Sequence, residues 1–217
     1  MMYYSASMNT LDESLMNAVK EGKLLESSRT NIRLLLDGTE SPIAREAVEE
    51  LAAAGEWQEL NDRFYKTLAF GTGGLRGRTI GSIVTRAEQG NGGVNGRPEY
   101  PCVGTACMNY FNVGRAMRGL IIYVNKHVEA TDPGRKPRLV IGHDTRHFSR
   151  DFAEFCAKIG TDLGCDIYLF DSPRATPEIS FAIRELHADS GVVLTASHNP
   201  SHDNGFKAYF NDGAQLV

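Results

Sequence analysis

One alternation of apolar runs constrains the fold of this chain more than any other feature. Residues 138–142, 165–170 and 191–194 are short runs rich in apolar and β-branched residues, which is typical of buried strands. The segments between them carry apolar residues at helical spacing, over 152–163 and 176–186. This strand–helix–strand–helix–strand order predicts parallel strands joined by right-handed crossovers, with helices on both faces of the sheet. The expected fold class is therefore α/β.

Polar residues follow each of the three predicted strands. Asp144 and Arg146 follow the first strand, Asp171 and Ser172 the second, and Ser197 the third. Parallel strands place their carboxyl ends at one edge of the sheet, and open α/β sheets bind their ligands at that edge. We therefore expect these residues to meet at a ligand site.

The loop after the third strand is the most unusual stretch of the chain. Residues 195–200 read T-A-S-H-N-P, and residues 203–207 read D-N-G-F-K. Pro200 prevents the strand from continuing, so we expect Ser197 on an irregular loop. Its hydroxyl lies within ten residues of the imidazole of His198, the amide of Asn199 and the ammonium of Lys207. On spacing alone, a polar loop that merely caps a strand is an equally good interpretation.

A glycine-rich stretch earlier in the chain predicts an anion site. Residues 70–77 read F-G-T-G-G-L-R-G. Glycines permit a positive φ and free backbone amides that cradle an anion, and an arginine such as Arg76 can grip a phosphate with two parallel hydrogen bonds. The alternative is a glycine-rich turn with a solvated arginine, because short glycine patterns are weak signals.

Composition excludes several classes of function. The 23 lysines and arginines against 27 aspartates and glutamates give a net charge of −4, and no long basic run is present, so nucleic acid is not an expected partner. No stretch approaches the roughly 18 consecutive apolar residues of a membrane span, and no secretory signal is visible, so we expect a cytoplasmic protein. The cysteines lack C-x-x-C spacing and are expected to be thiols rather than zinc ligands: Cys102, Cys107, Cys156 and Cys165.

The motif T-A-S-H-N-P-x-x-D-N-G-F-K resembles the phosphoserine loop of the α-D-phosphohexomutases, the phosphoglucomutase and phosphomannomutase family, and F-G-T-x-G-L-R is similar to their N-terminal motif. Many relatives have serine where this chain has Gly73. The resemblance covers residues 61–217 and implies the first domain of four, a three-layer α/β/α domain with a mostly parallel sheet. Helical periodicity before it, over 11–20, 42–51 and 57–68, predicts a helical N-terminal extension over residues 1–60.

The resemblance also implies roles for individual residues. Ser197 would carry the phosphoryl group, and Lys207 would act beside the reacting hydroxyl as a general acid–base or as a charge stabiliser. Arg76 would approach the phosphoserine, and Arg146 would support its loop through a segment similar to the family's G-x-D-x-R. The other expected site residues are His198, which would orient the loop, and Thr72 and Asn199, which would contact phosphate.

The implied reaction interconverts hexose 1-phosphate and hexose 6-phosphate through a bisphosphorylated sugar. The implied cofactor is magnesium, Mg²⁺, with an oxygen of the Ser197 phosphate as one ligand. The acidic metal loop of the family is absent from these residues, so the other ligands and further domains are expected downstream in a longer polypeptide, and the isolated chain is expected to be inactive.

Three alternatives remain from the sequence. A phosphopentomutase of the same family would share these motifs. A non-catalytic, sugar-phosphate-binding paralogue is a second alternative, against which the presence of Ser197 and Lys207 speaks. A serine hydrolase would require G-x-S-x-G, whereas this chain has Thr195 and Asn199 at the glycine positions.

Overall fold

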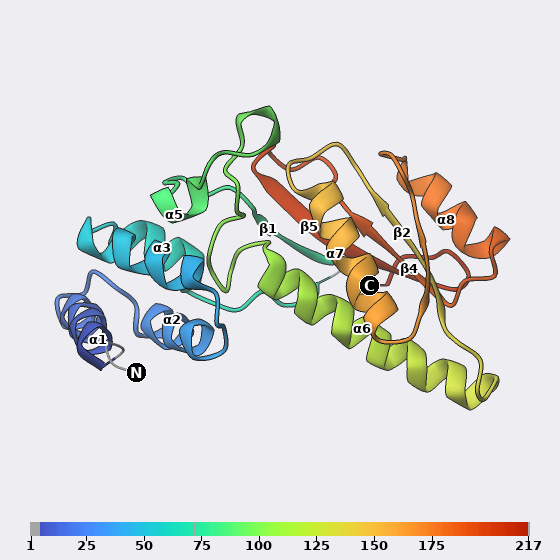
Figure 1. Ribbon diagram of the computed structural model, residues 1–217, viewed down its shortest axis with the longest axis horizontal. Coiled ribbons are helices and arrows are strands. Elements are labelled where there is room, and N and C mark those ends of the chain that lie inside the picture. Colours follow the sequence, from blue (N-terminus) through green and yellow to red (C-terminus); the bar gives the residue numbers. More distant parts are fainter. Residues whose placement is uncertain (1–4, 72, 217) are drawn as a thin grey trace. The chain divides into compact units, whose positions relative to one another are not determined.

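The structure, a computed structural model, describes the backbone of residues 5–71 and 73–216 (Figure 1). The chain packs as two compact units. The first contains the residues up to Leu68 together with Ile80–Cys107, and the second contains Ala69–Thr79 and the residues from Met108 onward. These are units of packing. The predicted domain boundary between residues 60 and 61 concerns the family domain and stays a prediction.

The first unit is helical. Its main helices are α1 (Ser5–Lys20), α2 (Glu26–Asp37), α3 (Pro42–Ala53) and α4 (Trp57–Phe64), followed by the short α5 (Arg86–Gln89) and the 3₁₀ turn η1 (Val94–Gly96). Helices α1, α3 and α4 confirm the helical periodicity of the sequence, whereas α2 was not expected. Burial of the apolar faces holds these helices together, and the fully buried side chains include Leu15, Ile32, Leu51, Leu60 and Phe64.

Helices α3 and α8 both begin without a side-chain cap. Ser41 precedes α3, whose first residue is Pro42, but the Ser41 side chain makes no capping hydrogen bond. Helix α8 (Thr176–Glu185) has Ala175 at its N-cap position, so Thr176 lies inside the helix and does not cap it. Both helices do have a proline in the first turn, where its missing N–H leaves no helical hydrogen bond unmade.

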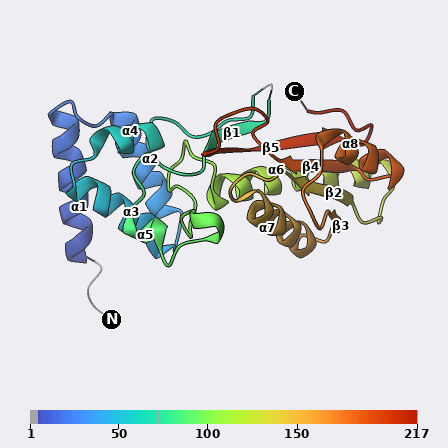
Figure 2. The same cartoon turned by 90° about the horizontal axis from the view of Figure 1, so that it is seen from above.

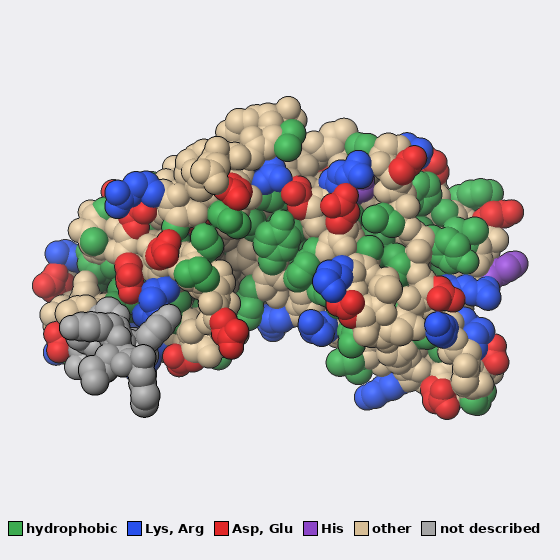
Figure 3. Space-filling view, viewed as in Figure 1, with side chains coloured by type: hydrophobic (Ala, Val, Ile, Leu, Met, Phe, Trp, Pro, Cys, Tyr) green, Lys and Arg blue, Asp and Glu red, His purple; other side chains and the backbone are tan. Residues whose placement is uncertain are grey.

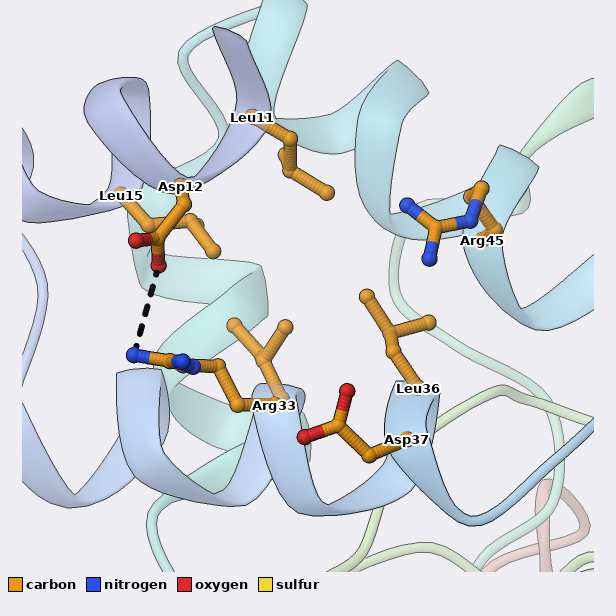
Figure 4. Close-up of a pocket in the computed structure, with 8 residues that line it drawn as sticks. Leu11, Asp12, Leu15, Arg33, Leu36, Asp37 and Arg45 are labelled. Atoms are coloured by element: carbon orange, nitrogen blue, oxygen red, sulfur yellow. Dashed lines mark ion pairs between the residues drawn. The ribbon is translucent and has the colours of Figure 1, made fainter. Parts of the chain in front are cut away.

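Helices α1, α2 and α3 enclose a crevice (Figure 4). Leu11, Leu15 and Ile32 form apolar walls. Arg33 lies 3.9 Å from Asp12, and Arg45 and Asp37 also line the crevice. Because two arginines are matched by two aspartates, the lining carries no net charge that would select an ion.

A buried ion-pair network organises the first unit. Arg63 donates from Nε to Oε1 of Glu59 at 2.8 Å and from Nη1 to Oε1 of Glu88 at 2.5 Å. All three side chains are almost fully buried. Glu88 Oε1 also accepts from the backbone N–H of Val103 at 2.8 Å. Glu88 thus anchors the start of the glycine-rich segment 88–104 in the interior of this unit.

The second unit contains a five-stranded sheet. Its strands are β1 (Leu75–Arg78), β2 (Arg138–His143), β3 (Asp166–Leu169), β4 (Ser190–Leu194) and β5 (Asp203–Phe210), in the order β1-β5-β4-β2-β3. The three strands predicted from the sequence, β2, β3 and β4, are parallel as expected. Strand β5 pairs antiparallel with both β4 and β1, so it alone of these five runs against the others.

Helices cover both faces of this sheet, which confirms the α/β class and the three-layer arrangement. Helices α6 (Tyr110–Thr131) and α7 (Ser149–Asp162) lie on one side and α8 on the other (Figure 2). The α8 side packs an apolar core around the sheet, formed by Val140, Ile179, Ile183, Val193 and Tyr209. Layers on both faces bury the central strands β2 and β4, which leaves the loops at the strand ends accessible.

Charges of both signs are interspersed over the face shown in Figure 3, so that face presents no broad area of positive charge. None of the helices among the described residues combines the length and apolarity needed to cross a membrane.

Candidate functional site

Ser197 lies on an exposed loop directly after β4, as the sequence predicted. Its backbone has φ 59°, in the left-handed region that serine seldom adopts. The conformation is held locally, because the backbone N–H of Ser197 donates to Oγ1 of the buried Thr195 at 2.9 Å. The backbone N–H of Asn199 donates to the carbonyl of Ala196 at 3.1 Å and closes the turn. The loop therefore presents the Ser197 hydroxyl to solvent from a fixed backbone.

Arg146 holds the serine loop through hydrogen bonds to its backbone. Its Nη1 and Nη2 atoms donate to four backbone carbonyls of the loop, and its Nε lies 3.4 Å from Oδ2 of Asp144. The four acceptors, at 2.6 to 3.1 Å, are the carbonyl oxygens of Ser197, Asn199, Pro200 and Asp203. Arginine suits this task because its planar guanidinium offers donors in a rigid fork. With both terminal nitrogens already donating to carbonyls, Arg146 is placed to support the loop.

A buried polar chain fixes Asp144 in turn. Asp144 Oδ1 accepts from the backbone N–H of Arg146 at 2.9 Å and from Oγ of Ser149 at 2.6 Å. Ser149 Oγ accepts from Nδ2 of Asn204 at 3.0 Å, and both residues are 0% exposed. These two residues were not expected in the site. The available signals were the position of Ser149 at the start of a helix shortly after Arg146, and that of Asn204 within D-N-G.

Arg76 and Lys207 lie on strands, which corrects the expectation that both lie in glycine-bearing loops. Arg76 is on β1 opposite Gly205 of β5, and Lys207 is two residues further along β5. The two side chains are therefore diagonal neighbours on one face of the sheet. A strand fixes each backbone in a hydrogen-bonded ladder, so these cations have less freedom than loop residues would have.

Lys207 is an uncompensated cation. It is only 9% exposed, and no hydrogen bond or ion pair joins its ammonium to another of the described residues. Burial lowers the pKa of Lys207 below its usual range, the positive charge of Arg76 lowers it further, and Asp144 opposes both effects. Because Asp144 is already paired with Arg146, the Arg76–Lys207 pair has a surplus of positive charge. Such a pair favours an anion.

The glycine-rich loop folds back onto β5 beside Lys207. Gly71 and Gly74 exchange two backbone hydrogen bonds, at 2.9 and 3.2 Å. Gly74 has φ +82°, and a Cβ there would lie 2.3 Å from the carbonyl oxygen of Phe206 and 3.2 Å from Cα of Lys207. Only glycine permits this approach. Thr72, one of the expected site residues, lies outside the described residues.

Arg76 connects the glycine-rich turn with the serine loop. Its Nε donates to the carbonyl of Gly73 and its Nη1 to Oδ1 of Asn199, both at 3.4 Å. The Asn199 amide also donates from Nδ2 to Oδ2 of Asp203 at 3.0 Å. Asn199 therefore bridges Arg76 and Asp203. The His198 Nδ1 lies 3.5 Å from Oγ of Ser197, at the limit of a hydrogen bond.

The structure brings Arg76, Arg146, His198 and Asn199 into contact with the Ser197 loop or its neighbours, with Lys207 beside Arg76 on the sheet. Asp171 and Ser172, which were also expected there, instead contact Arg174 after the edge strand β3. No group of three or more histidine, cysteine, aspartate or glutamate side chains that could hold a metal occurs among the described residues. The nearby carboxylates are already engaged, Asp144 by Arg146 and Asp203 by Asn199. The site is thus a serine hydroxyl beside surplus cations.

Comparisons with known proteins find related sequences and a related fold. The sequence profile of "Phosphoglucomutase/phosphomannomutase, alpha/beta/alpha domain I" matches residues 86–217. A phosphoglucomutase of Staphylococcus epidermidis strain ATCC 12228 is 37% identical over 159 residues, which cover 73% of this chain and 24% of the relative. A phosphoglucomutase of Staphylococcus aureus strain RF122 is 35% identical over 158 residues, with the same coverage of 73% and 24%.

The fold is also similar to that of a solved structure. The crystal structure of a putative phosphomannomutase from Thermus thermophilus superposes with a TM-score of 0.51 at 26% sequence identity, covering 70% of this chain and 28% of that one. The chain thus spans about a quarter of the length of the curated relatives it matches.

Proposed function

This chain belongs to the phosphoglucomutase/phosphomannomutase family, and we propose that its Ser197 carries a phosphoryl group that is exchanged with a hexose phosphate. The observation that carries the proposal is the position of Ser197. Its hydroxyl is exposed on a loop that Arg146 holds, at the sheet edge where Arg76 and Lys207 supply surplus positive charge. The names of the relatives support a hexose rather than a pentose phosphate as substrate.

Electrostatics support this assignment. A phosphoserine carries a charge of about −1.5 to −2 near neutral pH, so its formation requires cationic neighbours. Arg76 offers a permanent positive charge and the protonated form of Lys207 a second one, and neither has a carboxylate partner among the described residues. Phosphoryl transfer depends mainly on positioning and on stabilising charge at the transferred oxygens, which is what a fixed loop beside two strand-held cations provides.

In the proposed transfer, a sugar hydroxyl attacks the phosphorus of phosphoserine while the bond from phosphorus to Oγ of Ser197 breaks. The neutral form of Lys207, which its lowered pKa favours, takes up the hydroxyl proton and becomes positively charged beside the phosphoryl oxygens. Arg76 compensates charge on the phosphoryl oxygens. Ser197 is exposed, so water can return a proton to its oxygen. His198 orients the loop through its contact with the hydroxyl.

Magnesium fits this chain only in part. The described residues lack a cluster of acidic or imidazole ligands, so the one ligand we propose from them is an oxygen of the Ser197 phosphate. We therefore derive no step through the metal. The remaining ligands, the grip on the second phosphate of a hexose bisphosphate and the control of its reorientation are proposed for other domains of a longer polypeptide, since the chain spans only a quarter of its relatives.

The test uses the full-length protein incubated with glucose 1,6-bisphosphate. Intact mass and peptide mapping should place one phosphate on the peptide that contains Ser197, and Ser197→Ala should remove both the phosphate and the turnover of glucose 1-phosphate. Ser172→Ala is a matched control, because Ser172 also follows a strand of the same sheet. A stoichiometric phosphate on another serine, with full activity in Ser197→Ala, would refute the proposal.

A further inference from the structure

Two cysteines of the first unit face each other. The Sγ atoms of Cys102 and Cys107 are 3.3 Å apart, and each residue is 2% exposed. All four cysteines of the chain are described, and each is a thiol in this structure. The proposed phosphoryl transfer uses none of them. We propose that Cys102 and Cys107 form a reversible intramolecular disulfide when a hydroperoxide oxidises the protein.

The turn between the two cysteines already has the required geometry. A disulfide requires its sulfur atoms at about 2.05 Å, so the two must approach by about 1.3 Å, which is within the reach of side-chain rotation. The backbone N–H of Cys107 donates to the carbonyl of Gly104 at 3.4 Å and closes the turn. A Cβ at Gly104 would lie 2.8 Å from Sγ of Cys107, so glycine gives this sulfur its room.

Hydrogen bonds that do not involve the sulfurs also hold this turn in place. Val103, next to Cys102, is held through both of its backbone polar groups. Its N–H donates to Glu88 at 2.8 Å, and its carbonyl accepts from Nη1 of Arg63 at 3.4 Å. The hydrogen bond to Cys107 raises the pKa of Cys102, and burial raises it further. The resting pair is therefore a weak nucleophile, and its oxidation should be slow near neutral pH and faster as the pH rises.

The chemistry consumes one hydroperoxide. One thiolate attacks the outer oxygen of the peroxide, the O–O bond breaks, and a sulfenic acid and an alcohol (or water) form after protonation. The second sulfur then attacks the sulfenic sulfur, the S–O bond breaks, and hydroxide leaves as water with the proton of the second thiol. Two electrons pass from the sulfurs to the peroxide, and a dithiol reverses the bond by exchange.

The same turn supports the segment that leads into the glycine-rich loop. Thr105, between the two cysteines, donates from Oγ1 to the carbonyl of Lys66 at 2.7 Å and accepts through its carbonyl from the N–H of Leu68 at 2.9 Å. Ala106 donates its N–H to the carbonyl of Arg63 at 2.8 Å. A bond between Cys102 and Cys107 would therefore stiffen the anchor of residues 66–68, which precede the glycine-rich turn and strand β1.

The test uses the chain with Cys156→Ala and Cys165→Ala, which leaves the pair as its only thiols. Folded protein is treated with hydrogen peroxide and then unfolded in the presence of N-ethylmaleimide, which labels the remaining thiols. Its intact mass is measured by mass spectrometry. We expect loss of two hydrogen masses, no labelling at either cysteine, a cross-linked peptide containing both residues, and recovery of two labelled thiols after dithiothreitol. The bond should form faster at alkaline pH, and the amide of Leu68 should exchange more slowly in the oxidised protein.

Three results would overturn the proposal. The first is full labelling of both thiols after prolonged treatment of the folded chain. The second is oxygen addition to a single cysteine without a cross-link, and the third is a bond that forms only in urea. Cys102→Ser and Cys107→Ser, made separately in the same background, are the controls. Each retains one thiol and cannot form an intramolecular disulfide, so it should either stay labelled or gain the mass of one oxygen. A loss of two hydrogen masses in either variant would assign the observed change to a reaction other than the proposed bond.

Discussion

Two arginine-centred regions of this protein use positive charge in opposite ways. In the first unit, Arg63 is buried and directed at two carboxylates, those of Glu59 and Glu88. In the second unit, Arg76 and Lys207 share one face of the sheet without a carboxylate of their own among the described residues. In the first region the positive charge is balanced by carboxylates of the protein. In the second region an added anion would balance it.

This difference in pairing distinguishes a charged residue that supports the fold from one that serves the candidate site. A buried cation with matched acids is held by the fold, and breaking the match leaves an unpaired charge in the interior. A buried cation with no carboxylate partner, such as Lys207, lowers stability, so its presence points to a functional role. Arg146 stands between these cases, because its donors are engaged by backbone carbonyls of the serine loop. It serves the site by positioning.

The largest expected effect is on the first region. Arg63→Met should lower the free energy of unfolding by about 3–5 kcal/mol, because Glu59 and Glu88 would stay buried without their partner. Urea denaturation followed by circular dichroism measures this change. Arg86→Ala is the control: its side chain is 92% exposed beside Glu50, and its loss should change stability by less than about 0.5 kcal/mol. Equal effects of the two substitutions would show that the buried pairing of Arg63 contributes no more to stability than an exposed ion pair.

Substitutions in the second region should lower activity rather than stability. Arg76→Gln and Lys207→Met should each lower the turnover of the full-length enzyme at least tenfold, about 1.4 kcal/mol of transition-state stabilisation. Neither should destabilise the fold as Arg63→Met does, because neither cation has a carboxylate to leave unpaired. Steady-state kinetics and urea denaturation on the same preparations separate the two effects. Early unfolding of either variant, or a near-normal rate, would make its residue structural or incidental.

The smallest effect is a pH dependence of stability. Burial and Arg76 lower the pKa of Lys207 in the folded state, so the unfolded chain binds this proton more tightly. The resulting penalty is fully present below the folded-state pKa and disappears as the pH rises through that value toward the unfolded value of about 10.4. Wild-type protein should therefore gain stability relative to Lys207→Met as the pH rises toward about 10.4, to be measured by denaturation of both proteins across the alkaline range. A constant difference between the two would contradict this account.

The sequence predicted the parts of the fold that have a clear period. Strands β2 and β4 are apolar, β-branched runs, and the helices between the parallel strands repeat apolar residues at helical spacing. Strand β5 begins D-N-G, residue types that are depleted in strands, and β1 reads L-R-G-R, so both suggested loops. Helix α2 was missed because serine, threonine and asparagine obscure its apolar face.

The residues of the candidate site could be predicted from their motifs, but their geometry could not. The motifs led to Ser197, Arg76 and Lys207. A pattern of residue types does not say that Lys207 lies in a ladder, or that Arg146 reaches four carbonyls, because these contacts depend on the path of a loop. Ser149 is likewise explained only by tertiary packing, since its partner Asn204 lies 55 residues away.

The left-handed backbone at Ser197 has a consequence for which alcohols this position tolerates. Serine and threonine are similar acceptors of phosphate in chemical terms, yet a β-branched residue at φ 59° is a steric outlier. Threonine would therefore be disfavoured here by its methyl group. Aspartate and asparagine adopt this conformation more readily, so a carboxylate substitute for phosphoserine would fit the chain without strain. Conformation, before reactivity, limits the repertoire of side chains at this position.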